Sequence, residues 1–481
     1  MQSCLNPMVC DIGVHASMLK HTHSLSGFFN ESAALLRLSL PIIVTQLATQ
    51  GMNFVDTSMA GQVSATDLAA IAVGASLWYP ISLLLRGILM ALTPLTAHHR
   101  GSGQQQQINH ELGQGLWLAM AGSLLAILFL QQSEGIMAYM QVAPEVAPIA
   151  TQYLQALAFG VPGIALFYSL NSFCEGMGNT RAPMLFSLLG LAVNIPANYL
   201  LINGKFGLPA LGAAGCGWAT SIVYWLMSLM MGLYIARHHE YRQFLSRSVL
   251  QFKASQAWAQ FKLGLPIGMN IFICGSIFAI IALLIGKLGA NNIASHQIAL
   301  NFSGLMYMVP LSLSFGITIR VGHALGQGNA ALAKLRSYSG IALTLAFSCI
   351  SSASIVLFRE QIARIYTQDP LVAAGAASLI IFAACYQISD AIQTATNGVL
   401  RGYKDTKLPM FISGMAYWGL ALPVGYTLGL TDKVVDAMGA AGFWVGIIVG
   451  LTAAAIMMSL RLRTMLSKQQ AQPLQAELSF A

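Results

Sequence analysis

Two acidic residues, Asp56 and Asp390, lie inside long hydrophobic stretches of the sequence. All other Asp and Glu residues fall in predicted loops, helix ends or tails. An acid at the centre of a membrane helix costs about 2.5 to 3.5 kcal/mol, so both positions are candidates for function. Removal from water favours the protonated form of a carboxyl group, and we expect reversible protonation or cation binding. For Asp56, a position at the membrane interface is the alternative.

Polar side chains with helical spacing accompany the first acid. Asn194 and Asn198 are four residues apart and so share one face of a predicted helix, with Pro196 between them. Together with Asp56 and Thr220 they offer only oxygen ligands, which suit a hard cation such as Na⁺ or a hydrogen-bonded proton. Hydrogen bonding between neighbouring helices is the alternative interpretation.

An aromatic residue accompanies the second acid. Tyr386 precedes Asp390 by one helical turn, a pairing that suits an organic cation through charge and cation–π attraction, although packing is the simpler role for such a tyrosine. Arg86 is the single basic residue within a predicted hydrophobic span. It could pair with an acid, but snorkelling toward the cytoplasmic side is favoured.

The surrounding sequence is that of a polytopic membrane protein. It has 481 residues, of which 56% are hydrophobic and 8% charged, with a mean hydropathy of +0.66. This composition excludes a water-soluble fold, and about 20 apolar residues per helix predict an all-α bundle of twelve transmembrane helices. The predicted spans are 34–58, 67–95, 112–132, 145–170, 181–204, 211–236, 261–286, 292–319, 338–358, 370–396, 406–430 and 438–460.

Charge in the loops predicts the orientation. Lys and Arg gather after even-numbered spans, whereas loops after odd-numbered spans contain Lys205, Lys287, Arg359, Arg364 and Lys433. By the positive-inside rule, both termini and the loop 237–262 are cytoplasmic, in a bacterial inner membrane. Residues 1–33 lack signal-peptide features and are expected to be a disordered tail, with Met18 as an alternative start. The scattered cysteines indicate no disulfide framework or metal site.

The chain contains an internal duplication. Residues 175–184 (EGMGNTRAPM) align with 401–410 (RGYKDTKLPM), and three further segment pairs align in the same order at nearly the same offset. A six-helix unit repeated in parallel gives two lobes with a cavity between them. The predicted organisation is a tail 1–33, an N-lobe 34–236, a linker 237–260, a C-lobe 261–463 and a tail 464–481.

Four segments resemble the NorM-type branch of the multidrug and toxic compound extrusion (MATE) family. They are residues 51–61 (GMNFVDTSMAG), 190–198 (GLAVNIPAN), 294–302 (ASHQIALNF) and 400–405 (LRGYKD). The resemblance covers about Ser32 to Leu462 and implies ion-driven efflux of organic cations such as dyes and fluoroquinolones by alternating access.

The resemblance also implies roles for individual residues. Positions matching Asp56, Asn194, Asn198 and Thr220 form an ion site in the N-lobe, and those matching Asp390 and Tyr386 belong to the C-lobe site. Some sodium-coupled relatives have a glutamate where this chain has Cys274, and a thiol is a poor ligand for a hard cation. Proton coupling is therefore expected, with Na⁺ at the N-lobe site as the alternative.

Other function classes are less consistent with the sequence. A flippase for lipid-linked precursors is the alternative with the same architecture, but its anionic cargo calls for several arginines in the cavity. No HExxH, GxSxG or aspartate-rich diphosphate motif is present, and we expect no enzymatic activity and no cofactor. The expected partners are small cationic substrates and membrane lipids but no nucleic acid, and the protein is expected to be a monomer that contributes to antibiotic resistance.

Overall fold

The computed structural model describes residues 25–207, 209–242, 249 and 251–478, with side chains up to residue 468. The described residues are 87% helical and contain no strands. Twelve helical segments among them are long and apolar enough to cross a membrane, which confirms the predicted all-α class and number of spans.

The helices of the first half follow one another with short connections. Residues Ala65–Leu89 and Leu92–Gly101 together form the second span, with a break between α3 and α4. The elements are α2 (Leu25–Gly61), α3 (Ala65–Leu89), α4 (Leu92–Gly101), α5 (Gln105–Leu130), α6 (Ser133–Tyr139), α7 (Ala147–Gly176), α8 (Arg181–Asn203), α9 (Ala213–Arg237) and α10 (His239–Arg242).

The second half repeats this succession. Its eleventh span is continuous from Lys407 to Leu430 but contains a π-helical turn. The elements are α11 (Ala254–Gly286), α12 (Ala290–Gly326), α13 (Ala330–Tyr366), α14 (Pro370–Gly402), α15 (Lys407–Gly414), the π-helix η2 (Met415–Ala421), α16 (Leu422–Leu430) and α17 (Ala440–Leu478).

Local sequence signals explain several helix ends. Ser64 caps α3 by accepting a hydrogen bond from the Asp67 backbone at 2.9 Å, and Asp369 caps α14 at the Leu371 backbone at 2.8 Å, with Pro370 as the first helical residue. These are the N-cap residue types that satisfy free N–H groups. Gly204 ends α8 in a left-handed conformation with φ of 64°.

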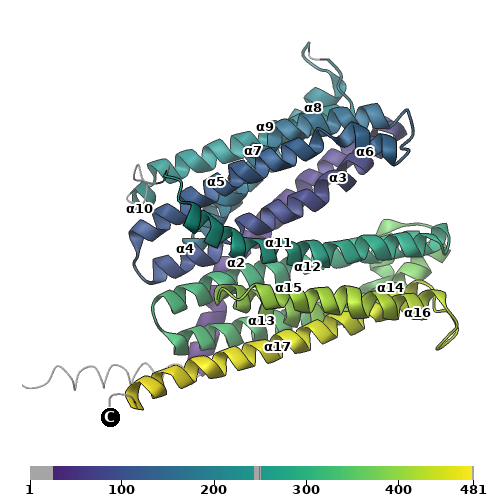
Figure 1. Cartoon of the computed structure of the whole chain (residues 1–481). Coiled ribbons are helices and arrows are strands. Elements are labelled where there is room, and N and C mark those ends of the chain that lie inside the picture. Colours follow the sequence, from purple (N-terminus) through teal and green to yellow (C-terminus); the bar gives the residue numbers. More distant parts are fainter. Residues whose placement is uncertain (1–24, 208, 243–248, 250, 479–481) are drawn as a thin grey trace, which may run out of the picture.

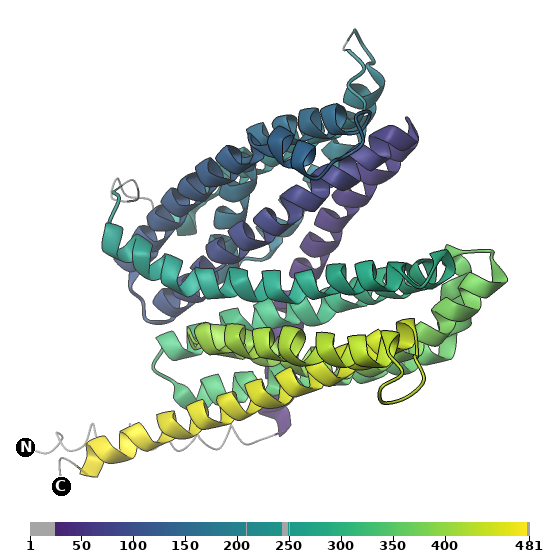
Figure 2. The same cartoon turned by 45° about the vertical axis from the view of Figure 1, so that its right-hand side comes forward.

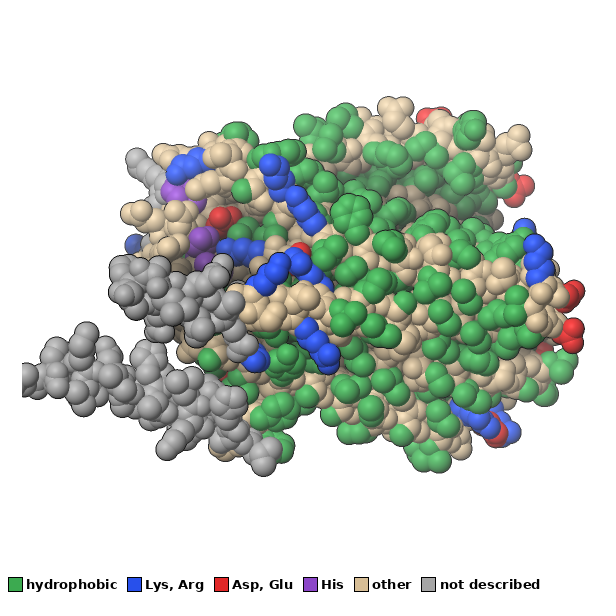
Figure 3. Space-filling model, turned by 60° about the horizontal axis from the view of Figure 1, so that its bottom comes forward, with side chains coloured by type: hydrophobic (Ala, Val, Ile, Leu, Met, Phe, Trp, Pro, Cys, Tyr) green, Lys and Arg blue, Asp and Glu red, His purple; other side chains and the backbone are tan. Residues whose placement is uncertain are grey.

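The helices form two layers that meet at one end and diverge toward the other (Figure 1). The N-lobe consists of α3–α9 with the second half of α2, and the C-lobe consists of α11–α17. Two buried apolar clusters lie within residues 52–241, and a larger one lies within residues 277–466 except for Leu35. The lobes contact each other where α3 packs on α11 and α4 packs on α12. Hydrophobic side chains cover the middle of the molecule, with charged groups toward its ends (Figure 3).

Helix α2 joins the lobes. In Figure 2 it passes behind the layers from the lower one to the upper one. Its first half contacts the C-lobe, where added Cβ atoms at Gly316 and Gly340 would meet Ser39 and Leu35. Its second half packs on α8, where an added Cβ at Gly51 would lie 3.3 Å from Leu191. The two halves of the first span therefore belong to different layers.

The predicted tail 1–33 is wrong in its last part, because residues 25–33 are helical in α2. Glu31 forms ion pairs with Arg320 and Arg336 of the C-lobe, and Ser32 is buried. These contacts between distant segments extend the helix beyond its hydrophobic run. Residues 1–24, including Met18, lie outside the described residues.

Two further boundaries differ from the predicted ones. Helix α11 begins at Ala254, inside the predicted linker 237–260, and α17 continues to Leu478, through most of the predicted tail 464–481. The added first part of α11, residues 254–260, contains no glycine or proline. The added last part of α17 contains several Gln, Leu and Ala residues, which are good helix formers, but also Pro473. Residues 243–248 and 250 of the linker are not described.

Candidate functional site

The four predicted N-lobe residues lie together. The Asp56 Oδ1 accepts hydrogen bonds from the Asn194 and Asn198 side-chain amides at 3.1 and 2.6 Å. The Thr220 hydroxyl donates to the Asp56 Oδ2 at 2.8 Å. The Asn198 amide also contacts the Asn194 oxygen at 3.1 Å. Helices α2, α8 and α9 thus supply one carboxylate and three neutral donors.

The helical spacing explains this geometry. Asn194 and Asn198 are fully buried on one face of α8, which packs against α2 and α9. Asp56 is half-buried near the end of α2, and its carboxylate points into the N-lobe toward these donors. No basic side chain of the described residues forms an ion pair with it. The negative charge is therefore stabilised by neutral hydrogen bonds and remains available to a proton or cation.

The second acid has a sparser environment. Asp390 is 7% exposed in α14, and the Thr394 hydroxyl donates to its carboxylate at 3.5 Å, the limit of a hydrogen bond. Tyr386 is buried in the C-lobe core, with its ring centroid 5.8 Å from that of Trp444. The tyrosine also interacts with the Asp390 carboxyl and the Ser303 side chain, and its role in binding an organic cation stays a prediction.

Sequence reasoning missed several polar contacts of the C-lobe. The Tyr417 hydroxyl donates to the Gln393 oxygen at 3.1 Å, and the Cys274 thiol donates to the Asn270 oxygen at 3.3 Å. Thr394 could have been found, because it lies four residues after Asp390 in the same helix. Tyr417 lies in η2, and π-helical turns are frequent at functional sites.

Two charged residues near the ends of helices are buried. Glu175 lies in α7 and Arg401 in α14, at matching positions of the internal repeat, and each is 7% exposed. Asn171 donates to the Glu175 carboxylate at 3.0 Å, and Arg401 donates to the Ser314 hydroxyl at 2.7 Å. Both residues lie in the last turn of their helices, where Glu175 was expected among the helix ends, but the burial of the two side chains was not predicted.

Arg86 forms no ion pair among the described residues, and its two predicted roles stay predictions. Its Nη2 donates to the Gln46 side-chain oxygen at 2.7 Å, and its guanidinium carbon lies 5.4 Å from the centroid of the Tyr168 ring. Both contacts are with neighbouring helices, α2 and α7.

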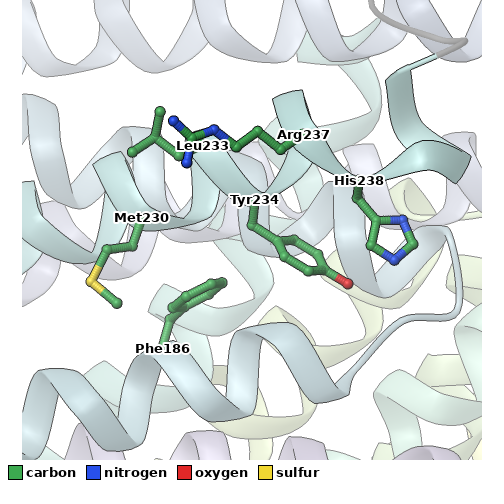
Figure 4. Close-up of a pocket in the computed structure, with 6 residues that line it drawn as sticks. All are labelled: Phe186, Met230, Leu233, Tyr234, Arg237 and His238. Atoms are coloured by element: carbon green, nitrogen blue, oxygen red, sulfur yellow. The ribbon is translucent and has the colours of Figure 1, made fainter.

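A pocket of about 430 Å³ lies elsewhere, where α8 approaches the end of α9 (Figure 4). Its lining combines apolar and basic side chains, namely Phe186, Met230, Leu233, Tyr234, Arg237 and His238. None of the predicted site residues lines it. Among the described residues, no three His, Cys, Asp or Glu side chains are grouped as a metal site would require.

Comparison with known proteins identifies the family of the chain. The MatE family model matches residues 41–200 and 266–427, one match in each half of the chain. The multidrug resistance protein MdtK of Yersinia enterocolitica is 47% identical over 443 residues, which are 90% of this chain and 95% of the relative. MdtK of Yersinia pestis has the same identity and coverage.

Solved structures of MATE transporters have the same fold. The eukaryotic MATE transporter AtDTX14 superposes with a TM-score of 0.81 and 22% identity over 91% of this chain and 96% of that chain. The outward-facing conformation of a multidrug resistance MATE family transporter superposes with a TM-score of 0.83 and 18% identity over 92% and 97%. With the family model matching both halves, the chain belongs to the MatE family of MATE transporters.

Proposed function

We propose that this protein is a multidrug efflux transporter that exchanges organic cations for protons by alternating access of its two lobes. The relatives at 47% identity are named multidrug resistance proteins and match nearly the whole chain. The observation that carries the proposal is the Asp56 cluster, in which a carboxylate is surrounded by neutral donors and lacks a basic partner among the described residues. Such a group can bind a proton or a cation in alternation.

Proton coupling is favoured over Na⁺ coupling. In the C-lobe, the side chain that faces Asn270 is the thiol of Cys274, a poor ligand for a hard cation. The N-lobe cluster has oxygen ligands that suit either ion. We place the end with α4 on the cytoplasmic side of a bacterial inner membrane, because most loop Lys and Arg residues lie there. We further propose that the protein acts as a monomer.

The flippase alternative is not favoured. An anionic lipid-linked cargo would require several accessible cations along its path, whereas Arg401 is enclosed and bound to Ser314, and Arg320 and Arg336 share Glu31. The relatives named for multidrug resistance support efflux of drugs instead.

Everted membrane vesicles can test the proposal. Addition of a cationic dye to vesicles with an imposed pH gradient should release protons from the lumen, with the same result in sodium-free buffer. The Asp56→Asn variant should lose this response. Dye-dependent ion flux that requires sodium would show that the coupling ion is Na⁺ and not the proton. The absence of any dye-dependent ion flux in the parent protein would refute antiport.

A further inference from the structure

The pocket between α8 and α9 opens on the lipid-facing surface of the N-lobe. Leu233, which lines it, is 44% exposed. Leu229, one turn earlier on the same face of α9, and Leu185 on α8 are exposed as well. Exposed leucines on two spans that are long and apolar enough to cross a membrane mark a surface that lipid covers. The mouth of the pocket is therefore in contact with lipid.

The pocket lies near the ends of its two helices, where lipid headgroups are found. Helix α8 begins at Arg181, the neighbouring α9 ends at Arg237, and Phe186 is only about 7.5 Å along α8 from its start, at a rise of about 1.5 Å per residue. Asn179, just before α8, donates to the Tyr234 hydroxyl at 2.9 Å and so joins the two helix ends. Arginines near the ends of membrane helices extend their charge toward the headgroups.

The lining changes from apolar to basic along one face of α9. Met230, Leu233 and Arg237 follow one another at spacings of three and four residues, which places them on the same side of the helix. Figure 4 shows Phe186 on α8 opposite Tyr234, with a ring centroid distance of 5.8 Å. The His238 ring lies 5.1 Å from that of Tyr234, toward the helix end. The pocket thus has an apolar part toward the membrane and a polar part toward the interface.

The polar part suits an anion. Arg237 is exposed, and no acid of the described residues forms an ion pair with it. Glu240 is the one acid of residues 237–242 (RHHEYR), and it does not line the pocket. A guanidinium matches the oxygens of a phosphate through two parallel hydrogen bonds. The Tyr234 hydroxyl accepts from Asn179, so its proton can be donated to the same anion.

We infer that this pocket binds one phospholipid with an anionic headgroup. Its phosphate contacts Arg237 and Tyr234, and an acyl chain runs along Phe186, Met230 and Leu233. Basic pockets between membrane helices at the interface recognise anionic lipids in this way. A zwitterionic headgroup would bring an ammonium group close to the same cation and bind less well. The site is independent of the transported compound and of the coupling ion.

Binding of single lipids to the full-length protein in a neutral detergent tests the inference. Native mass spectrometry would compare phosphatidylglycerol with phosphatidylcholine of the same acyl chains. The parent should bind phosphatidylglycerol about five- to tenfold more tightly, the effect of one cation at the membrane surface. Arg237→Gln should abolish this preference and leave phosphatidylcholine binding within about twofold. Arg181→Gln is the matched control, because Arg181 is exposed at the same end but does not line the pocket, and it should keep the preference.

A second variant tests the pocket itself. Leu233→Trp keeps every charge but fills the apolar part, so it should weaken binding of both lipids while the melting temperature without lipid stays that of the parent. Equal affinities for the two lipids in the parent, or equal losses in Arg181→Gln and Arg237→Gln, would overturn the inference. Unchanged binding in Leu233→Trp would place the lipid outside the pocket. Displacement of phosphatidylglycerol by millimolar inorganic phosphate would indicate a site for free anions and not for lipid.

Discussion

At the residue scale, the Asp56 carboxylate depends on three neutral donors from two neighbouring helices. Asp56→Asn keeps the shape of the side chain but removes the ionisable group, so coupled efflux should fall at least about a hundredfold while the protein still folds. Proton release from vesicles measures coupled efflux, and the melting temperature in detergent measures folding. Asp436→Asn, in an exposed segment, is the matched control. Undiminished efflux in Asp56→Asn would exclude this carboxylate from coupling.

Sequence alone identified this cluster and, in the C-lobe, Asp390 with Tyr386, but not the polar contacts around the second acid. Asn194 and Asn198 could be found because helical spacing places them on one face, and the acid is conspicuous in an apolar stretch. The Tyr417–Gln393 contact could not be found, because it joins spans whose relative rotation depends on packing. The burial of Glu175 and Arg401 was missed because a hydrophobic run indicates where a helix lies in the membrane, not how closely its ends are packed by neighbouring helices.

At the element scale, α4 and α12 contact each other at Gly101 and Gly326, which occupy matching positions of the internal repeat. An added Cβ at Gly101 would overlap the His323 backbone oxygen, and one at Gly326 would overlap that of His98. Each added Cβ would also lie 3.0 Å from the Cα of the opposite glycine. The reciprocal contact follows the internal duplication, and neither helix end can accept a side chain without moving the lobes apart.

Gly326→Ala should therefore separate the lobes at this crossing. Spin labels at the exposed positions Gln104 and Gln327, in a variant without exposed cysteines, should show a longer distance by several ångströms than in the parent. Gly304→Ala is the control on the same helix, because no atom lies within 4 Å of its added Cβ. An unchanged distance in Gly326→Ala would show that the crossing can adjust locally.

At the scale of the whole molecule, α2 connects the ion site of one lobe to the charges of the other. Its residue Asp56 lies in the N-lobe cluster, whereas Glu31 near its start pairs with Arg320 and Arg336. Glu31→Gln leaves two mostly enclosed arginines without an acid and should destabilise the protein by about 1 to 3 kcal/mol. Thermal unfolding in detergent measures this loss, and Glu31→Gln with Arg336→Gln should recover part of it. A melting temperature equal to that of the parent would show that the ion pairs contribute little.

The acids in separate lobes also bear on how many protons the molecule exchanges. One proton against one monovalent drug moves no net charge, and a pH unit then supplies about 1.4 kcal/mol. A second proton makes the exchange sensitive to voltage, which adds about 2.3 kcal/mol per 100 mV, or roughly fiftyfold in the drug gradient. We expect Asp56 to carry the first proton and Asp390, enclosed in α14, the second.

Reconstituted vesicles with an imposed potential can separate the two protons. The parent should build a drug gradient that grows with voltage at constant pH, whereas Asp390→Asn should respond to the pH gradient alone and accumulate less drug. Thr394→Val removes the weak 3.5 Å hydrogen bond to Asp390 and the contact of Thr394 with Tyr307 but keeps the acid. It should therefore keep the voltage response, which makes it the matched control. If Asp390→Asn kept the full voltage response, the second charge would have to move through another group, and buried Glu175 would be the next acid to replace.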